Sequence, residues 1–154
     1  MYKKKLRKVC TQVLGIARSN LMKDGYLQPC GLIYSGTKLT HVFPFRFGSY
    51  EEKKAAQMAF RKALNEFEAS AAVVILESWI RMAKDGTLDL TRPVSEMPEK
   101  EVVVVEGSSP KARIMIIQVF ERIHERIVFH TPFEPDERME WSSEWLDGAW
   151  RSQG

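Results

Sequence analysis

The chain has 154 residues, of which 44% are hydrophobic and 28% are charged, a composition typical of one soluble globular domain. No apolar run approaches the length of a membrane-spanning helix. No long apolar stretch follows the basic start MYKKKLRKVC, so we do not expect a secretory signal. We therefore expect a single cytoplasmic domain over residues 1–154. Cys10 and Cys30 are too few for a disulfide framework or a four-cysteine metal site and indicate reduced thiols.

The net charge of +3 is divided unevenly along the chain. Residues 1–23 hold seven basic side chains and no acidic one, whereas residues 134–154 hold six acidic and two basic side chains. We expect the two ends to attract each other, which lowers the positive potential available to a nucleic acid. The basic segment 3–24 therefore predicts weak and strongly salt-dependent binding of nucleic acid.

Two helices are predicted from the spacing of apolar residues. Residues 3–24 carry apolar side chains every three or four positions, and an Asp-Gly pair marks the end of this helix. Ser49 and Glu52 form a capping box directly before an alanine- and phenylalanine-rich stripe, which predicts a second helix over about residues 50–69. Between the helices, GLIY-SGT-KLTHVF is typical of two strands joined by a tight glycine turn.

Four further strands are predicted after the second helix. They cover AAVVILESWIRM (71–82), EVVVVEG (101–107), ARIMIIQVFE (112–121) and RIVFHTPF (126–133). Runs of strands, rather than strict alternation with helices, favour an α+β fold with a mostly antiparallel sheet. We expect the order α-ββ-α-ββββ, with two helices on one face of the sheet and a tryptophan-bearing C-terminal tail.

The stretch ILESWIRM (75–82) places Glu77, Trp79 and Arg81 at a spacing of two. Side chains alternate between the faces of a strand, so these three share one face. We interpret the row as structural, at the point where a partly covered face reaches solvent, and expect a tail residue or a second subunit to cover Trp79. The competing hypothesis makes Trp79 the floor of a ligand site beside Glu101.

The tail carries three tryptophans, Trp141, Trp145 and Trp150. Large aromatic side chains near a terminus either bury themselves or mark an interface. We expect residues 139–154 to be ordered, docked on the sheet of their own domain or on a partner subunit. Both alternatives are open, and the second makes the protein a homo-oligomer.

Other patterns in the sequence indicate no metal or cofactor site. His41, His124 and His130 lie at no spacing that brings three ligands together along the chain. The segment GSSPK (107–111) lacks the P-loop pattern and the helix that would follow it. A turn between two antiparallel strands explains it.

Acidic residues gather in and after a predicted loop at residues 89–100. Glu96, Glu99 and Glu101, with Lys100, resemble in part the charged cluster of a metal-dependent nuclease. That pattern also needs a partner aspartate on a neighbouring strand, which the sequence does not indicate. The cluster is better explained as a solvated loop.

Residues 70–107 resemble a group of uncharacterised bacterial proteins. The likeness rests on Glu77, Ser78 and Trp79 in a strand after a helix, on SEMPEKE (95–101), and on the valine-rich strand that follows. The group shares an acidic-Trp strand, an S-E-x-P-(D/E)-(R/K)-E loop and a Val-rich strand. The resemblance implies no known activity.

The leading hypothesis is a non-catalytic binding or interaction domain that self-associates. The alternative is a small hydrolytic enzyme that uses the acidic residues of the 89–101 loop. The third hypothesis is a weak nucleic-acid binder that uses the basic helix 3–24. The candidate ligand or interface face is Glu77, Trp79, Arg81 and Glu101, and the candidate interface in the tail is Trp141, Trp145 and Trp150.

Overall fold

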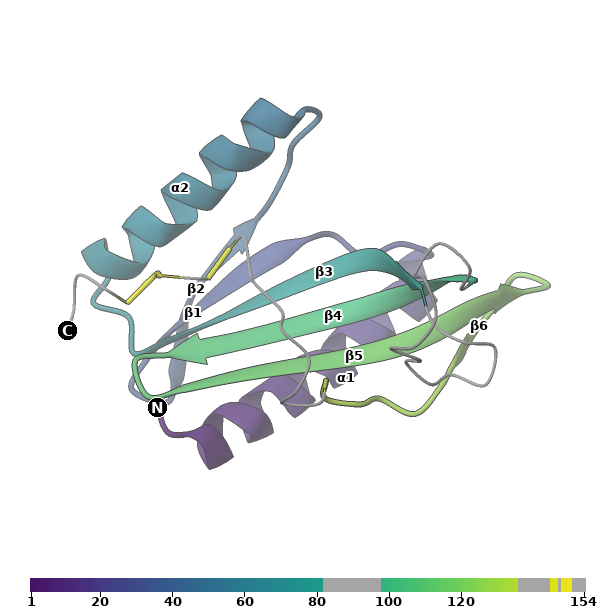
Figure 1. Ribbon diagram of the computed structural model, residues 1–154, viewed down its shortest axis with the longest axis horizontal. Helices are drawn as coiled ribbons and strands as arrows, with labels where there is room; N and C mark the ends of the chain where they lie inside the picture. The colour runs from purple at the N-terminus through teal and green to yellow at the C-terminus, as the bar shows by residue number, and fades with distance from the viewer. Residues whose placement is uncertain (82–97, 136–144, 147, 151–154) are drawn as a thin grey trace.

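The computed structural model describes residues 1–81, 98–135, 145–146 and 148–150 (Figure 1). It contains two helices and six strands in the predicted order α-ββ-α-ββββ. Their bounds are α1 Lys3–Asp24, β1 Cys30–Ser35, β2 Lys38–Pro44, α2 Tyr50–Glu66, β3 Ala71–Arg81, β4 Glu99–Ser109, β5 Ala112–Ile123 and β6 Arg126–Phe129. The α+β fold class is confirmed.

The six strands form one antiparallel sheet in the order β2-β1-β3-β4-β5-β6. Gly36, at φ 63°, makes the tight turn between β1 and β2. Across the middle strands, Trp79 pairs with Glu101, and Glu101 pairs with Phe120. This register places Trp79, Glu101 and Phe120 side by side across three neighbouring strands.

Helix α1 covers one face of the sheet. Its buried stripe packs against alternate residues of β3, namely Ala71, Val73 and Ile75. Val103 and Val105 of β4 belong to the same core cluster. The apolar spacing that predicted this helix is therefore the surface that it buries.

Helix α2 covers the opposite face of the sheet, so the prediction that both helices share one face is wrong. Phe60 and Leu64 of α2 pack against Ala72 and Val74, which alternate with the β3 residues under α1. The helices are well separated in Figure 1. The first half of β3 is apolar on both faces, and such a strand needs cover on each side. The apolar pattern of β3 alone does not predict which helix covers which face of the sheet.

Part of the tail packs on its own domain. Trp145 is 2% exposed and lies in the core cluster between α2 and the sheet. Arg61 of α2 donates from Nε to the backbone oxygen of Trp145 at 3.1 Å, and the indole N–H of Trp150 donates to Ser108 Oγ at 2.8 Å. Trp141 lies outside the described residues.

The two oppositely charged ends meet at one point. Arg7 of α1 donates from Nε to Glu134 Oε2 at 2.9 Å. Both side chains are more than 40% exposed, so solvent screens the pair and it contributes little to the stability of the fold. Its consequence is electrostatic, because it neutralises one of the basic side chains of α1.

Candidate functional site

The end of α1 leaves part of its sheet face uncovered. Gly25 adopts a left-handed conformation at φ 78° and its N–H donates to Leu21, which ends the helix. The β3 residues beyond Ile75 on this face are Glu77 and Trp79, and neither belongs to the core cluster under α1. The predicted row therefore lies where the helix stops.

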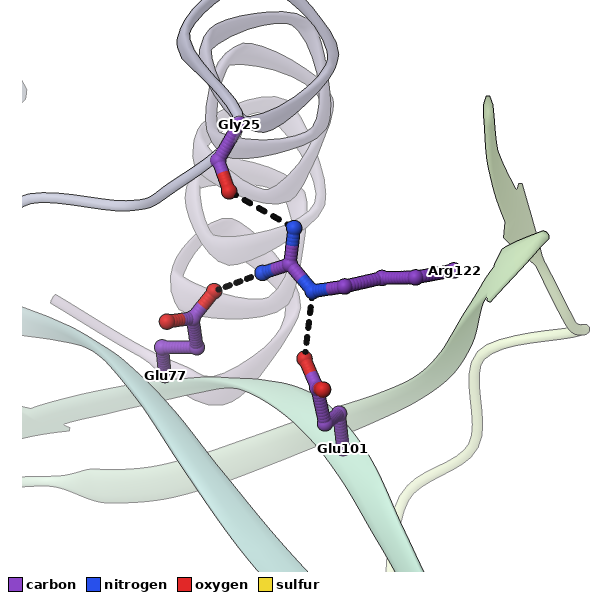
Figure 2. A network of polar contacts seen from close by, with 4 residues as sticks. All are labelled: Gly25, Glu77, Glu101 and Arg122. Carbon is purple, nitrogen blue, oxygen red and sulfur yellow. Dashed lines mark hydrogen bonds and ion pairs between the residues drawn. The ribbon is translucent and has the colours of Figure 1, made fainter. Parts of the chain in front are cut away.

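One guanidinium joins three elements at this place (Figure 2). Arg122, near the end of β5, donates from Nε to Glu101 Oε2 at 3.0 Å and from Nη2 to Glu77 Oε1 at 3.3 Å. Its Nη1 donates to the backbone oxygen of Gly25 at 2.7 Å. The same group lies over the ring of Phe120, 5.4 Å from the ring centroid. Arg122 therefore fixes the positions of both carboxylates.

The two carboxylates share one positive partner, which leaves a net negative charge. Burial raises the pKa of Glu77, and the neighbouring Glu101 raises it further, whereas the positive charge of Arg122 lowers it. The side chains of Glu77 and Glu101 are 29% and 21% exposed. Arg122 therefore compensates the negative charge only in part.

Trp79 is 60% exposed and lies directly across from Glu101. None of the described tail residues covers it, and cover by a second subunit stays a prediction. Among the described residues, no cation and no aromatic ring contacts its indole. Arg81 follows in the same strand, but its side chain lies outside the described part. We call Glu77, Trp79 and Glu101 the Trp79 face.

A cavity of about 470 Å³ adjoins the network on the side away from β3. It is lined by Met22, Gly25, Arg122, Glu125, Arg126 and Ile127. Arg122 lines this cavity, whereas Glu77, Trp79 and Glu101 do not. The competing hypothesis placed Trp79 at the floor of a ligand site beside Glu101; the two residues share a face of the sheet, and neither lines this cavity.

The other predicted chemical groups are dispersed. His41 stacks on Phe67 at 3.9 Å between ring centroids, His130 contacts Glu121 at 3.2 Å, and His124 lies in the β5–β6 turn. No group of three or more potential metal ligands occurs within the described ranges. Glu96 falls outside those ranges, so the acidic loop is not described as a unit.

The turn between β4 and β5 is shorter than the segment predicted for it, residues 107–111. Gly107 and Ser108 still belong to β4, which ends at Ser109. The hydroxyl of Ser109 accepts from the N–H groups of Lys111 and Ala112 at 3.2 and 3.1 Å. These bonds are typical of a side chain that stabilises a tight hairpin turn.

The basic residues at the start of α1 face solvent. Lys3, Lys4, Lys5 and Lys8 are exposed. Weak binding of nucleic acid through this helix stays a prediction.

Neither of the described helices combines the length and the hydropathy that a transmembrane span requires.

Sequence reasoning missed Arg122 and the backbone oxygen of Gly25. Alternation along β5 places Arg122 on the face of Phe120 and Ile116, which pack under α1. That signal was available in the sequence. The sequence did not indicate the partners of Arg122, because they depend on the order of β3, β4 and β5 in the sheet.

Comparison with known proteins found no matching family model, no similar curated protein and no similar solved structure. The resemblance of residues 70–107 to uncharacterised bacterial proteins therefore stays a prediction.

Proposed function

We propose that this protein is a non-catalytic binding domain and that it binds its ligand on the Trp79 face. The observation that carries the proposal is the 60% exposure of Trp79. Tryptophan is among the residues most enriched at the energetic centres of interfaces, because it offers a large rigid surface with a polar tip. Here the ring lies beside two carboxylates that Arg122 already holds in place.

The same geometry supports binding over hydrolysis. A hydrolytic pair of carboxylates needs one acid and one base with separate environments. Glu77 and Glu101 instead accept from the same guanidinium. Neither carboxylate lines the neighbouring cavity.

The proposal predicts where small molecules bind. We expect fragments from a chemically mixed library to shift the indole N–H signal of Trp79 in a ¹⁵N-labelled sample, with the signal assigned by Trp79→Phe. The buried indole of Trp145, 2% exposed, serves as the internal control and should not respond. Hits that leave the Trp79 signal unchanged and gather elsewhere contradict the proposal.

Self-association is a second candidate function, favoured by the open edge of the sheet at β2. Among the described strands it pairs with β1 alone, and its residues Leu39 and Val42 are 45% and 58% exposed. Val42 pairs with Leu32, whose side chain packs under α1, so Val42 extends the same apolar face beyond the helix. The other edge is the four-residue β6. An apolar edge strand is a template for pairing with a second copy about a two-fold axis.

Replacing Val42 with lysine should therefore convert a dimer to a monomer. A charge at this position opposes edge pairing, because two copies would bring two lysines close together. Light scattering after size-exclusion chromatography measures the change. Val128→Lys on β6 is the matched control, since Val128 is 45% exposed at the opposite edge. A wild-type chain that is monomeric at all accessible concentrations excludes this candidate.

A further inference from the structure

We propose that the Trp79 face recognises an arginine side chain of a partner protein. This inference rests on the proposed function and adds the chemistry of the group that is bound. It commits the face to one occupant because its exposed indole ring, its charge and the carboxylate oxygens that accept from no described residue all match a guanidinium.

The first argument concerns the free acceptors. Arg122 occupies Oε1 of Glu77 and Oε2 of Glu101. The second oxygen of each carboxylate accepts no hydrogen bond from the described residues. A carboxylate has capacity for several donors, so both remaining oxygens can accept from a ligand. Because Arg122 fixes the two side chains, their free oxygens are already ordered before a ligand arrives.

The second argument concerns the ring. The exposed face of an indole attracts a cation, and tryptophan is the strongest of the aromatic residues in this respect. A guanidinium is planar, so it stacks on an aromatic ring while its N–H groups still reach carboxylates at its edge. An ammonium group makes point contacts and does not stack in this way, which favours arginine over lysine.

The chain contains an internal example of the same chemistry. Arg122 lies over the ring of Phe120 while it donates to Glu77 and Glu101. The two carboxylates are thus spaced so that one guanidinium bonds both. A guanidinium from a partner would lie over Trp79 as Arg122 lies over Phe120, and it would donate to the remaining oxygens of Glu77 and Glu101.

The third argument concerns charge. Two carboxylates and one guanidinium carry a net charge of minus one. Burial raises the pKa of Glu77 more than the charge of Arg122 lowers it, so desolvation disfavours the ionised form of this carboxylate. A bound cation stabilises that form, whereas an anionic partner would meet repulsion from both carboxylates.

The test compares two probes of nearly identical shape. N-acetyl-arginine N-methylamide carries the guanidinium, and the corresponding citrulline compound replaces it with a neutral urea. We expect the arginine probe to shift the indole signal of Trp79 with an affinity at least about tenfold higher than the citrulline probe. The lysine compound should bind more weakly than the arginine compound. Equal affinities for arginine and citrulline overturn the inference.

Two variants test which carboxylate causes the preference for the arginine probe over the citrulline probe. Glu101→Gln keeps a side chain that can accept from Arg122 but removes one negative charge, and it should reduce the ratio between the two probes to below about threefold. Glu125→Gln is the matched control, because Glu125 lines the cavity and not the Trp79 face; it should leave the ratio unchanged. A ratio that survives Glu101→Gln overturns the assignment of this face.

The outcomes also separate the two proposals. Binding of neutral or anionic fragments to Trp79 without preference for arginine leaves the binding function standing and refutes the arginine inference. Arginine binding that shifts other signals, with Trp79 unaffected, refutes both.

Discussion

Replacing Trp145 with alanine is expected to lower the free energy of unfolding by about 3–5 kcal/mol. The side chain is 2% exposed and stacks on Phe45 with 4.1 Å between ring centroids. It also belongs to the core cluster that contains Phe60 and Leu64 of α2. Its removal leaves a cavity lined by rigid aromatic rings, which collapse poorly around it. Denaturant unfolding followed by circular dichroism measures the change.

Trp79→Ala is the control for this measurement, because it removes the same side chain from an exposed position. We expect a loss below about 1 kcal/mol, typical of surface substitutions. Similar losses for both variants would contradict the assignment of Trp145 to the core and Trp79 to the surface.

Local signals in the sequence predicted most of the element boundaries. The capping box is present, since Ser49 Oγ accepts from the N–H of Glu52 at 3.1 Å. The carboxylate of Glu52 accepts in turn from the N–H of Gly48 at 2.7 Å. The end of α2 was placed three residues too late, because the left-handed Glu68, at φ 49°, carries no glycine signal in the sequence.

The candidate site could be predicted only in part. Alternation along β3 placed Glu77 and Trp79 on one face, and the structure agrees. The contact between Glu77 and Arg122 joins residues 45 positions apart, and it requires β4 to lie between β3 and β5. No local pattern encodes strand order, so the sequence indicated Glu101 as a neighbour but not the guanidinium that connects the two carboxylates.

The exposure of Trp79 depends on another distant feature. Whether a sheet residue is covered is decided by the length and direction of the helix above it. Here α1 ends at Asp24, and the backbone oxygen of the following Gly25 lies close enough to accept a hydrogen bond from Arg122. The sequence predicted where the helix ends, but not which strand residues lie beneath that end.

Substituting alanine for Gly107 is expected to destabilise the protein by about 1–3 kcal/mol through overpacking under α1. A Cβ at this position would overlap Cys10 Sγ and would lie 3.1 Å from Leu6 Cδ1. Both neighbours are fully buried side chains of α1, so the helix has to move away from β4. Glycine inside a valine-rich strand is otherwise unfavourable, and the close approach of the helix explains its presence.

The cause is tested by removing the atom in conflict. Cys10→Ala alone is expected to cost about 1 kcal/mol, because it deletes a buried sulfur whose pKa burial raises to about 12 and which therefore packs as an uncharged group. In the double variant the new methyl group occupies the space that the sulfur leaves. The loss of stability in the double variant should then be smaller than the sum of the two single losses by at least about 1 kcal/mol, the scale found for residues in direct contact. Additive losses in a double-mutant cycle by urea unfolding would show that Gly107 is required for its backbone conformation and not for the approach of α1.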